Sequence, residues 1–420
     1  MNKLFWQWVE EHIGDNPSKL RLSAKPRSDF DVAAAITQIE CRQRFGKKLA
    51  DTLGRFPHFF FPSTLAGEQA TSDLLAAYHE RILADGGGGC SGGDGGGGCN
   101  GGGCSVVDLT CGLGIDAFHL ARKVGRVLAC DRNSAIIEAL DYNKVGLGLN
   151  NIETVSGDCR DMVKELSGDV AFIDPARRAA DGSRVFGLRD CEPDLTAMYG
   201  DIAARFGRLI VKASPMLDIA QTIAELPDTT DIYILGTKTE CKELVALVDF
   251  RQTGSHPVPV VHAVTLWPDG KTVEIAFTRS DEAEAPATPE RVSLPSKGDI
   301  LYEPYPATMK AAPFRLLASR YGLSKFHPNT HLYFGPADRP AEDFPGELFE
   351  IVDVVEWKSK NIKRLKSVYP NAMVTVRNFG MSAEALRSKL GIKEGGTTRL
   401  RIFGIGLGTD HTDRILVVAR

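Results

Sequence analysis

Residues 106–117 have the sequence Val106-Val107-Asp108-Leu109-Thr110-Cys111-Gly112-Leu113-Gly114-Ile115-Asp116-Ala117. The β-branched start is typical of a strand, and Gly112 and Gly114 permit a tight turn after it. A glycine-rich turn between a strand and a helix lets a ligand approach the backbone N–H groups at the amino end of that helix. The segment therefore predicts a strand, a ligand-binding loop and a helix, in that order.

Short β-branched runs alternate with helical stretches from about residue 105 to 279. The predicted strands span residues 106–108, 127–131, 152–155, 170–174, 209–212, 232–235, 261–266 and 273–277. This alternation favours right-handed βαβ units and a largely parallel, doubly wound α/β sheet of the Rossmann-like class. The last two strands have no helix between them, and Pro268-Asp269-Gly270 favours a turn, so we expect an antiparallel hairpin at the sheet edge.

The region before this sheet is predicted to be helical. Apolar residues at helical spacing predict helices over about 30–53 and 71–83. The aromatic segment 58–62 between them is interpreted as a hydrophobic plug rather than as a platform that stacks on a substrate. Residues 86–103 contain 13 glycines, which predicts a flexible insertion. The cysteines near it lack the paired spacing of zinc sites, so we expect no metal site.

Aspartates recur where four predicted strands end. Asp108 precedes the glycine loop, Asp131 ends the second strand, Asp158 follows the third and Asp174 ends the fourth. Because the carboxyl ends of parallel strands meet at one sheet edge, these carboxylates are expected to line one crevice, which would suit a cation. For each of them, a helix cap or a turn residue is the structural alternative.

Two cofactors are compatible with the glycine loop. GLGIDA matches the G-x-G-x-x-A fingerprint of dinucleotide sites, so an NAD-dependent oxidoreductase is one alternative. S-adenosylmethionine carries a sulfonium and an ammonium group and no pyrophosphate, so an acid-lined loop suits it better. Nothing at the end of the fourth strand serves hydride transfer.

The order of these motifs resembles that of the class I methyltransferases, with DxxxGxGxD, an acid at strand two, an acid after strand three and [DN]PPx at strand four. The resemblance implies a seven-stranded sheet and S-adenosyl-L-methionine as the cofactor. It places Asp108 near the methionine ammonium and lets Gly112 and Gly114 bring the cofactor close to the backbone. It also assigns Asp131 to the ribose hydroxyls and Asp158 to the adenine amino group.

The segment Asp174-Pro175-Ala176-Arg177-Arg178 is the clearest indication of the chemistry. In amine methyltransferases with [DN]PP[YFW], the acid or amide and the first proline carbonyl accept hydrogen bonds from an exocyclic amine. By this resemblance, Asp174, Pro175 and Arg177 are the candidate catalytic residues. Ala176 replaces the second proline and Arg177 the aromatic residue, so the two arginines could stack on a base, bind a phosphate or lie in an exposed turn. Lys212 and segment 240–243 are expected at the same crevice edge.

Composition and charge limit the class of protein. With 420 residues, 43% hydrophobic and 25% charged, the chain has enough apolar material for two or three packed domains, which excludes a disordered or fibrous protein. It has no apolar run of about 18 residues and no recognisable signal peptide, so we expect a soluble, cytoplasmic protein with no membrane contact. Residues 291–420 carry a net charge of +7 and residues 1–290 one of −11, which suggests that the carboxyl-terminal part binds a polyanion.

The positive charge is concentrated between residues 357 and 382. This segment has no acidic residue and contains Lys358, Lys360, Lys363, Arg364, Lys366 and Arg377. A helix over 358–366 would bury Ile362 and Leu365 and present its cations to phosphates, or it would simply be a solvated face. A further helix is predicted from Ser382 to Leu390, ended by Gly391, and the acidic segment 281–290 is predicted to be a linker.

Motifs along the whole chain extend the resemblance. The chain resembles bacterial RNA methyltransferases that add a small ferredoxin-like unit and a THUMP-like domain to the catalytic domain. The segments that carry this resemblance are 68–72 (EQATS), DPARR, ECKEL, 302–304 with 310–311, and 376–379 followed by 386–390. The implied domains are a helical domain (1–84), the insertion (85–104), the methyltransferase domain (105–280), a ferredoxin-like unit (291–322) and a THUMP-like RNA-binding domain (323–420).

The same resemblance implies the function. It implies methylation of an exocyclic amine of a base in RNA, with tRNA or rRNA as the expected substrate. No obligate protein partner is evident from the sequence. A DNA or small-molecule methyltransferase, or a catalytically silent RNA-binding protein, is the alternative.

Overall fold

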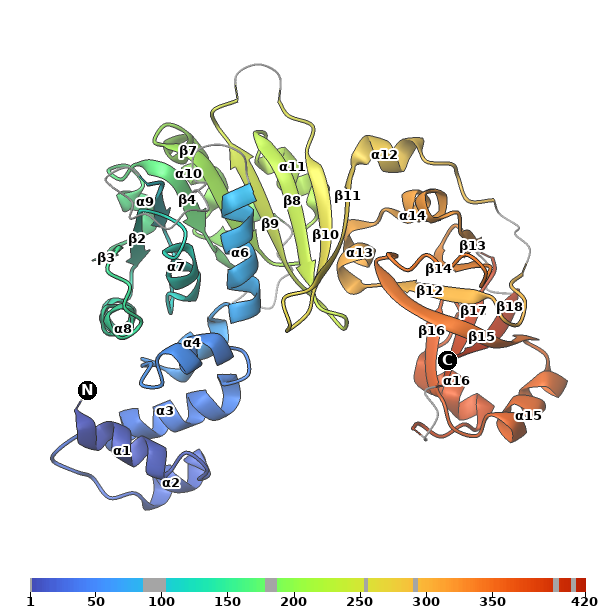
Figure 1. The fold of residues 1–420 in the computed structure, drawn as a ribbon, viewed down its shortest axis with the longest axis horizontal. Coiled ribbons are helices and arrows are strands. Elements are labelled where there is room, and N and C mark those ends of the chain that lie inside the picture. The colour runs from blue at the N-terminus through green and yellow to red at the C-terminus, as the bar shows by residue number, and fades with distance from the viewer. Residues whose placement is uncertain are drawn as a thin grey trace. The chain divides into compact units, whose positions relative to one another are not determined.

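The computed structural model describes residues 2–85, 103–177, 187–252, 256–289, 294–395, 400–408 and 413–420. The chain forms two compact units, one of Met1–Ile232 with Glu243–Val258 and one of Tyr233–Lys242 with Pro259–Arg420. Each unit is described by itself (Figure 1). The predicted glycine-rich insertion lies almost entirely outside the described residues. No helix of the described segments is long and apolar enough to span a bilayer.

The first unit begins with a helical region. Its helices are α1 (Lys3–Glu11), α2 (Pro17–Ser23), α3 (Val32–Phe45), α4 (Ala50–Arg55), α5 (Thr64–Gln69) and α6 (Asp73–Asp85). The helix predicted over 30–53 is divided into α3 and α4 by a turn that begins at Gly46, a residue of low helix propensity. Phe59 and Phe61 are fully buried, and Gln38 exchanges two hydrogen bonds of 2.9 Å with the Phe61 backbone. The aromatic segment therefore packs as the plug interpretation requires.

The main sheet has nine strands in the order β11-β10-β8-β9-β7-β4-β1-β2-β3. Their bounds are β1 (Ser105–Asp108), β2 (Arg126–Asp131), β3 (Ile152–Ser156), β4 (Gly168–Ile173), β7 (Phe206–Ala213), β8 (Thr229–Gly236), β9 (Cys241–Asp249), β10 (Val260–Leu266) and β11 (Thr272–Thr278). Strands β3, β2, β1, β4 and β7 pair in parallel. The α/β class is thus confirmed.

Two features of the sheet refine the prediction. The final pair, β10 and β11, forms the expected antiparallel hairpin. The sheet has nine strands, compared with eight predicted from the residue pattern and seven implied by the resemblance. Strand β9 was not predicted as a strand; it pairs antiparallel to β7. Its central residues are buried on both faces, so the alternation that would reveal a strand is absent from its sequence.

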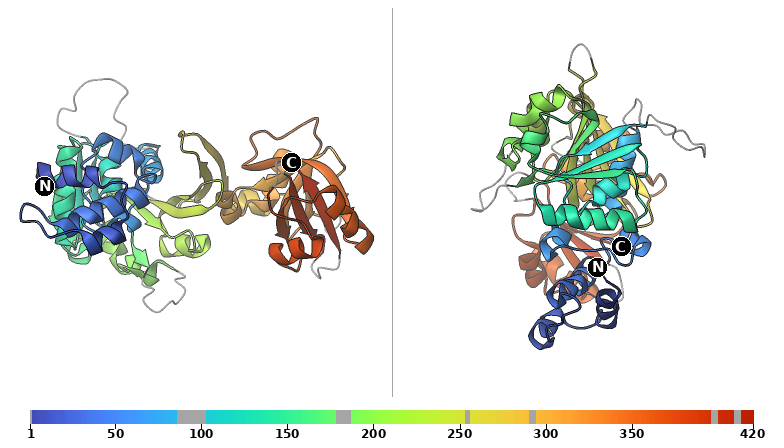
Figure 2. Two further views of the ribbon diagram at one scale, coloured as in Figure 1. Left: turned by 90° about the horizontal axis from the view of Figure 1, so that it is seen from below. Right: turned by 90° about the vertical axis from the view of Figure 1, so that its left-hand side faces the viewer.

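Helices between the strands cover both faces of the parallel part of this sheet (Figure 2). They are α7 (Ile115–Leu120), α8 (Ser134–Gly146), α9 (Cys159–Met162), α10 (Leu195–Ala203) and α11 (Ile219–Glu225). The last two residues of DPAR form β5 (Ala176–Arg177), which pairs antiparallel with β6 (Cys191–Glu192), just after a 3₁₀ turn at Leu188–Asp190. Because helices cover both faces, ligands reach such a sheet at the carboxyl ends of its strands.

The second unit contains a seven-stranded sheet in the order β13-β14-β12-β15-β18-β17-β16. Its elements are β12 (Ile300–Pro304), α13 (Pro306–Ala311), α14 (Phe314–Tyr321), β13 (Ser324–His327), β14 (Thr330–Gly335), β15 (Gly346–Glu356), α15 (Ser359–Val368), β16 (Met373–Arg377), α16 (Ala383–Leu390), β17 (Arg401–Gly406) and β18 (Arg414–Ala419). Leu365 of α15 and Leu386 and Leu390 of α16 pack in one apolar cluster with strands β17 and β18.

Local capping explains where two helices of this unit lie. Ser382 caps α16 by accepting a hydrogen bond from the Ala385 N–H at 3.2 Å, and Gly391 ends it at φ 63°, as predicted. The segment predicted as a linker over 281–290 instead begins inside helix α12 (Arg279–Glu284). Thr278 and Asp281 form a reciprocal capping box there, and this local signal outweighs the Ala/Pro-rich composition.

Candidate active site

The loop between β1 and α7 is shaped by two glycines with positive φ. Gly112 has φ +50° and Gly114 has φ +86°, which L side chains rarely adopt. A Cβ atom at Gly114 would lie 2.8 Å from Leu140 Cδ1, so this glycine is also required for packing. At Gly112 a Cβ atom would meet nothing within 4 Å, so space is open beside the loop. The loop can therefore admit a ligand against its backbone at Gly112.

Asp108 and Asp174 lie at the ends of the adjacent strands β1 and β4. The Asp108 carboxylate is 1% exposed and accepts a hydrogen bond from the Thr110 N–H at 3.2 Å. The Thr110 hydroxyl in turn accepts a hydrogen bond from the Asp174 N–H at 2.7 Å. This link holds the DPAR segment against the glycine loop.

Burial and like charges affect the titration of Asp108. Desolvation raises its pKa well above the ordinary value, and the carboxylates of Asp116 and Asp174 add to the rise. A cation close to Asp108 would favour its ionised form.

Asp131 and Asp158 are the other two aspartates that were predicted to lie at strand ends. Asp131 accepts hydrogen bonds from the Gly112 N–H at 3.1 Å and the Asn133 N–H at 2.9 Å, so it braces the glycine loop from β2. Asp158 caps α9 and accepts a hydrogen bond from Arg160 Nε at 2.8 Å. The hydrogen bond from Arg160 lowers the pKa of Asp158 to about 2. Asp158 therefore fulfils the helix-cap alternative, and its predicted adenine contact stays a prediction.

Lys212 of β7 holds the Asp174 side chain. Its Nζ forms an ion pair with Asp174 Oδ2 and donates a hydrogen bond to Thr71 Oγ1 at 2.9 Å. The Lys212 side chain is 11% exposed, whereas that of Asp174 is 37% exposed, so the carboxylate is accessible although its counter-ion is buried. Burial raises the pKa of Asp174, and the charge of Lys212 opposes that rise.

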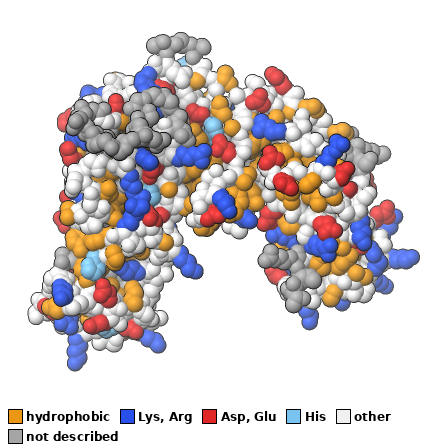
Figure 3. Space-filling view, viewed as in Figure 1, with side chains coloured by type: hydrophobic (Ala, Val, Ile, Leu, Met, Phe, Trp, Pro, Cys, Tyr) orange, Lys and Arg blue, Asp and Glu red, His pale blue; other side chains and the backbone are white. Residues whose placement is uncertain are grey.

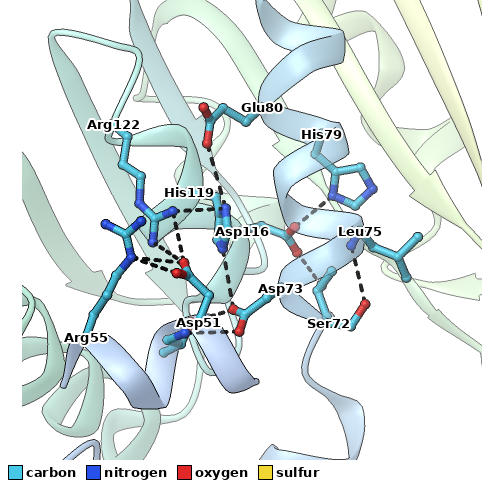
Figure 4. Close-up of polar contacts among 12 residues, drawn as sticks. Asp51, Arg55, Ser72, Asp73, Leu75, His79, Glu80, Asp116, His119 and Arg122 are labelled. Atoms are coloured by element: carbon cyan, nitrogen blue, oxygen red, sulfur yellow. Dashed lines mark hydrogen bonds and ion pairs between the residues drawn. The ribbon is translucent and has the colours of Figure 1, made fainter. Parts of the chain in front are cut away.

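His79 of α6 lies between the carboxylates of Asp116 and Glu243, close to the Lys212–Asp174 ion pair. Its Nδ1 is 2.7 Å from Asp116 Oδ1 and its Nε2 is 2.5 Å from Glu243 Oε1, and the ring is fully buried. Burial lowers the pKa of His79, but Glu243 and Asp116 outweigh it and raise the pKa to about 10. The Thr71 hydroxyl donates to the other oxygen of Asp116. Figure 4 shows His79 pointing from α6 toward Asp116 of α7.

A second buried histidine lies nearby but contacts different groups. His119 Nε2 of α7 is 3.4 Å from Asp73 Oδ1, and its Nδ1 is 3.7 Å from Glu80 Oε2 (Figure 4). Asp73 also accepts hydrogen bonds from the Thr52 hydroxyl at 2.5 Å and the Thr52 N–H at 3.0 Å. These contacts join α6 and α7 to each other and to α4.

Sequence reasoning located some of these residues and missed others. The four aspartates and both loop glycines were predicted, whereas His79 and Asp116 were given no role. Thr71 and Glu243 lie in the EQATS and ECKEL segments, so the resemblance of those segments was the signal for their part in the site. Pro175 is buried, the Arg177 backbone pairs with Cys191, and Arg178 lies outside the described residues.

Comparisons with known proteins agree with this architecture. A ferredoxin-like domain model matches residues 301–345 and a THUMP domain-like model matches residues 346–420. The predicted boundary between these two parts was at 322/323. No protein of curated function is detectably similar in sequence.

Solved structures include one that is similar along nearly the whole chain. The crystal structure of a "putative methyltransferase" from Porphyromonas gingivalis W83 is 27% identical, with a TM-score of 0.81, and the match covers 99% of this chain and 97% of that chain. An rRNA methylase from Streptococcus thermophilus is 16% identical, with a TM-score of 0.27, over 35% of this chain and 87% of that one. The predicted class is thus confirmed: the chain has the fold of a methyltransferase, with ferredoxin-like and THUMP-like domains at its carboxyl end.

Proposed function

We propose that the protein transfers a methyl group from S-adenosylmethionine to an exocyclic amine of a base in RNA, with tRNA or rRNA as the expected substrate. One observation carries this proposal. Asp174 presents an accessible carboxylate, held by the buried Lys212, beside the open glycine loop and the buried Asp108. This arrangement combines an acceptor for an amine with an open loop beside a buried acid, which suits a cationic cofactor.

The residues of the loop fit S-adenosylmethionine. Open space beside Gly112 leaves room for a group against the backbone, and a buried carboxyl at Asp108 lies where an ammonium group would compensate its charge. Asp131 accepts a hydrogen bond from the loop, and its remaining lone pairs can accept hydrogen bonds from ribose hydroxyls. When bound, the cofactor supplies an electrophilic methyl group on a sulfonium.

Asp174 and the Pro175 carbonyl would act on the substrate amine. Lys212 occupies one carboxylate oxygen of Asp174, so the other can accept a hydrogen bond from the amine. Two acceptors in fixed positions hold the amine in line with the methyl group and direct its lone pair toward it. Transfer of the cofactor's methyl group to the amine nitrogen would require the amine to lose a proton, and the Asp174 carboxylate or water would accept it.

The second unit supports an RNA substrate. Helix α15 buries Leu365 and exposes Lys360, Lys363, Arg364 and Lys366, and Figure 3 shows Lys and Arg side chains gathered on the face that carries it. Arg364 pairs with Asp353 at 2.8 Å, which leaves the lysines as the phosphate ligands that we propose. A base must leave its stack to reach Asp174, at a cost of about a few kcal/mol.

The test is transfer of a labelled methyl group to nucleic acid. Wild-type protein is incubated with tritiated S-adenosylmethionine and total RNA, DNA or protein from a strain that lacks it, and the modified nucleoside is identified by mass spectrometry. We expect label in RNA, and a loss of about 10²–10³-fold in kcat for Asp174→Ala, because the amine loses a preorganised acceptor. Cofactor binding should be largely retained.

Two results would contradict the proposal. Label in DNA alone would mean that DNA, and not RNA, is the substrate. Absence of any transfer, together with full RNA affinity of Asp174→Ala, would indicate a catalytically silent RNA-binding protein.

A further inference from the structure

The Lys212–Asp174 pair is part of a longer buried network. Its members come from the helical region (Thr71 and His79), from α7 (Asp116), from the end of β4 (Asp174) and from strands β7 and β9 (Lys212 and Glu243). Every neighbouring pair in this set is joined by a hydrogen bond or an ion pair. The network therefore connects α6 to the residue proposed to contact the substrate.

The charges in this network leave Lys212 with competing partners. Three carboxylates, those of Asp116, Asp174 and Glu243, share two cations. Lys212 Nζ is ion-paired with Asp174, but it also lies 4.0 Å from Asp116 Oδ2, and Glu243 attracts its charge as well. In a buried site these attractions are far less screened than in water. What determines the position of Lys212 is therefore how the other two carboxylates are neutralised.

His79 neutralises both of them at once. One ring nitrogen faces Asp116 and the other faces Glu243, at hydrogen-bond distance in each case. Thr71 fixes the direction of the hydrogen bonds between these groups. Its single hydroxyl proton is donated to Asp116, so its oxygen can only accept the hydrogen bond from Lys212. Asp108, the remaining nearby carboxyl, is hydrogen-bonded to Thr110 and has no contact of this kind with His79 in the described structure.

We propose that His79 is a positioning residue for methyl transfer: by compensating Asp116 and Glu243 it keeps Lys212 on one oxygen of Asp174, so that the second oxygen can accept a hydrogen bond from the amine. This inference rests on the proposed function. It assigns the helical amino-terminal region, through Thr71 and His79, a part in the active centre. It also explains why EQATS and ECKEL accompany DPARR, since each supplies one member of the network.

The test replaces His79 by a neutral residue that retains hydrogen-bonding capacity. In His79→Gln, Asp116 and Glu243 draw Lys212 away from Asp174, so the pKa of Asp174 should rise by about one unit. NMR spectra of protein labelled with ¹³Cγ-aspartate measure this pKa, with the Asp174 signal identified by its loss in Asp174→Asn. In the methyl-transfer assay on total RNA, kcat should fall about tenfold, the acid limb of the pH profile should move upward, and KM for the cofactor should change little.

Two further variants separate positioning from packing. His119→Gln removes the other buried histidine of the first unit's described residues, which contacts Asp73 and Glu80, and it should leave the pKa of Asp174 and the pH profile unchanged. In the background of His79→Gln, Glu243→Gln removes one competitor for Lys212 and should move the Asp174 pKa back toward the wild-type value.

The outcomes distinguish this inference from the proposed function. An unchanged Asp174 pKa in a folded His79→Gln variant, or equal effects of His79→Gln and His119→Gln, would overturn the positioning role. A shifted pKa in a protein that methylates no RNA would instead overturn the proposed function and leave the network intact.

Discussion

At the scale of single residues, we expect the proposed cofactor binding at Asp108 to depend on pH. Burial raises the pKa of its carboxyl, with Asp116 and Asp174 adding to the effect, so this carboxyl holds its proton to a higher pH than an ordinary aspartate does. An ammonium group beside Asp108 favours the ionised form, so binding should release this proton. Affinity for S-adenosylhomocysteine should then rise with pH, by up to tenfold per unit, until Asp108 is ionised in the free protein.

Calorimetric titration in two buffers of different ionisation enthalpy measures this proton release. Asp108→Asn should bind more weakly and without the pH dependence. Asp158→Asn is the matched control, because the hydrogen bond from Arg160 already lowers the pKa of Asp158 to about 2 and that carboxylate stays ionised throughout. An unchanged pH dependence in Asp108→Asn would show that another group releases the proton.

Residues differ in how far their role could be predicted from the sequence. Asp108, Asp131 and Asp174 follow strands whose β-branched runs are visible, so strand order alone predicts their common edge. His79 lies in an amphipathic helix, and its partners Asp116 and Glu243 are 37 and 164 residues away. A buried histidine in such a helix looks like any core residue until the tertiary contacts are known.

At the scale of secondary-structure elements, helix ends were predictable where a cap determines them. Ser382 and Gly391 bound α16 as expected, because each satisfies free backbone groups through its own chemistry. Strand β9 and helix α12 were missed for different reasons. Strand β9 lies within the sheet and lacks polar alternation, and α12 begins with a capping box in a segment whose composition is that of a linker.

Two glycines provide a test of helix-end geometry. Gly391 ends α16 at φ +63°, whereas Gly54 lies within α4 and has nothing within 4 Å of a Cβ position. Gly391→Ala should destabilise its unit by about 1 kcal/mol, because alanine is strained at positive φ. Gly54→Ala should instead stabilise its unit by up to about 1 kcal/mol, since alanine loses less conformational entropy in a helix. Urea unfolding followed by circular dichroism measures both, and effects of the same sign would contradict this account.

At the scale of the whole molecule, the two family-matched parts of the second unit share one sheet. Strand β12 of the ferredoxin-like part pairs with β15 of the THUMP-like part, and Glu303 of β12 binds Arg377 at 2.5 Å and Arg401 at 3.3 Å. The sequence predicted both parts through their motifs, but composition could not show that they share a core. The pairing needs contacts between residues far apart in the chain, which local patterns do not encode.

The division of charge along the chain leads to the last prediction. If the cations of α15 bind phosphates, each contact releases condensed counter-ions, so the logarithm of RNA affinity falls with the logarithm of salt concentration, with a slope set by the number of contacts. Replacing Lys360 and Lys363 by Ala should weaken binding to total tRNA and reduce that slope by about one to two. Lys19→Ala with Lys164→Ala removes the same charge from exposed sites of the first unit and should leave the slope unchanged. Filter binding across a salt series measures both double variants, and equal losses in the two would mean that net charge alone, and not the α15 surface, governs the affinity for RNA.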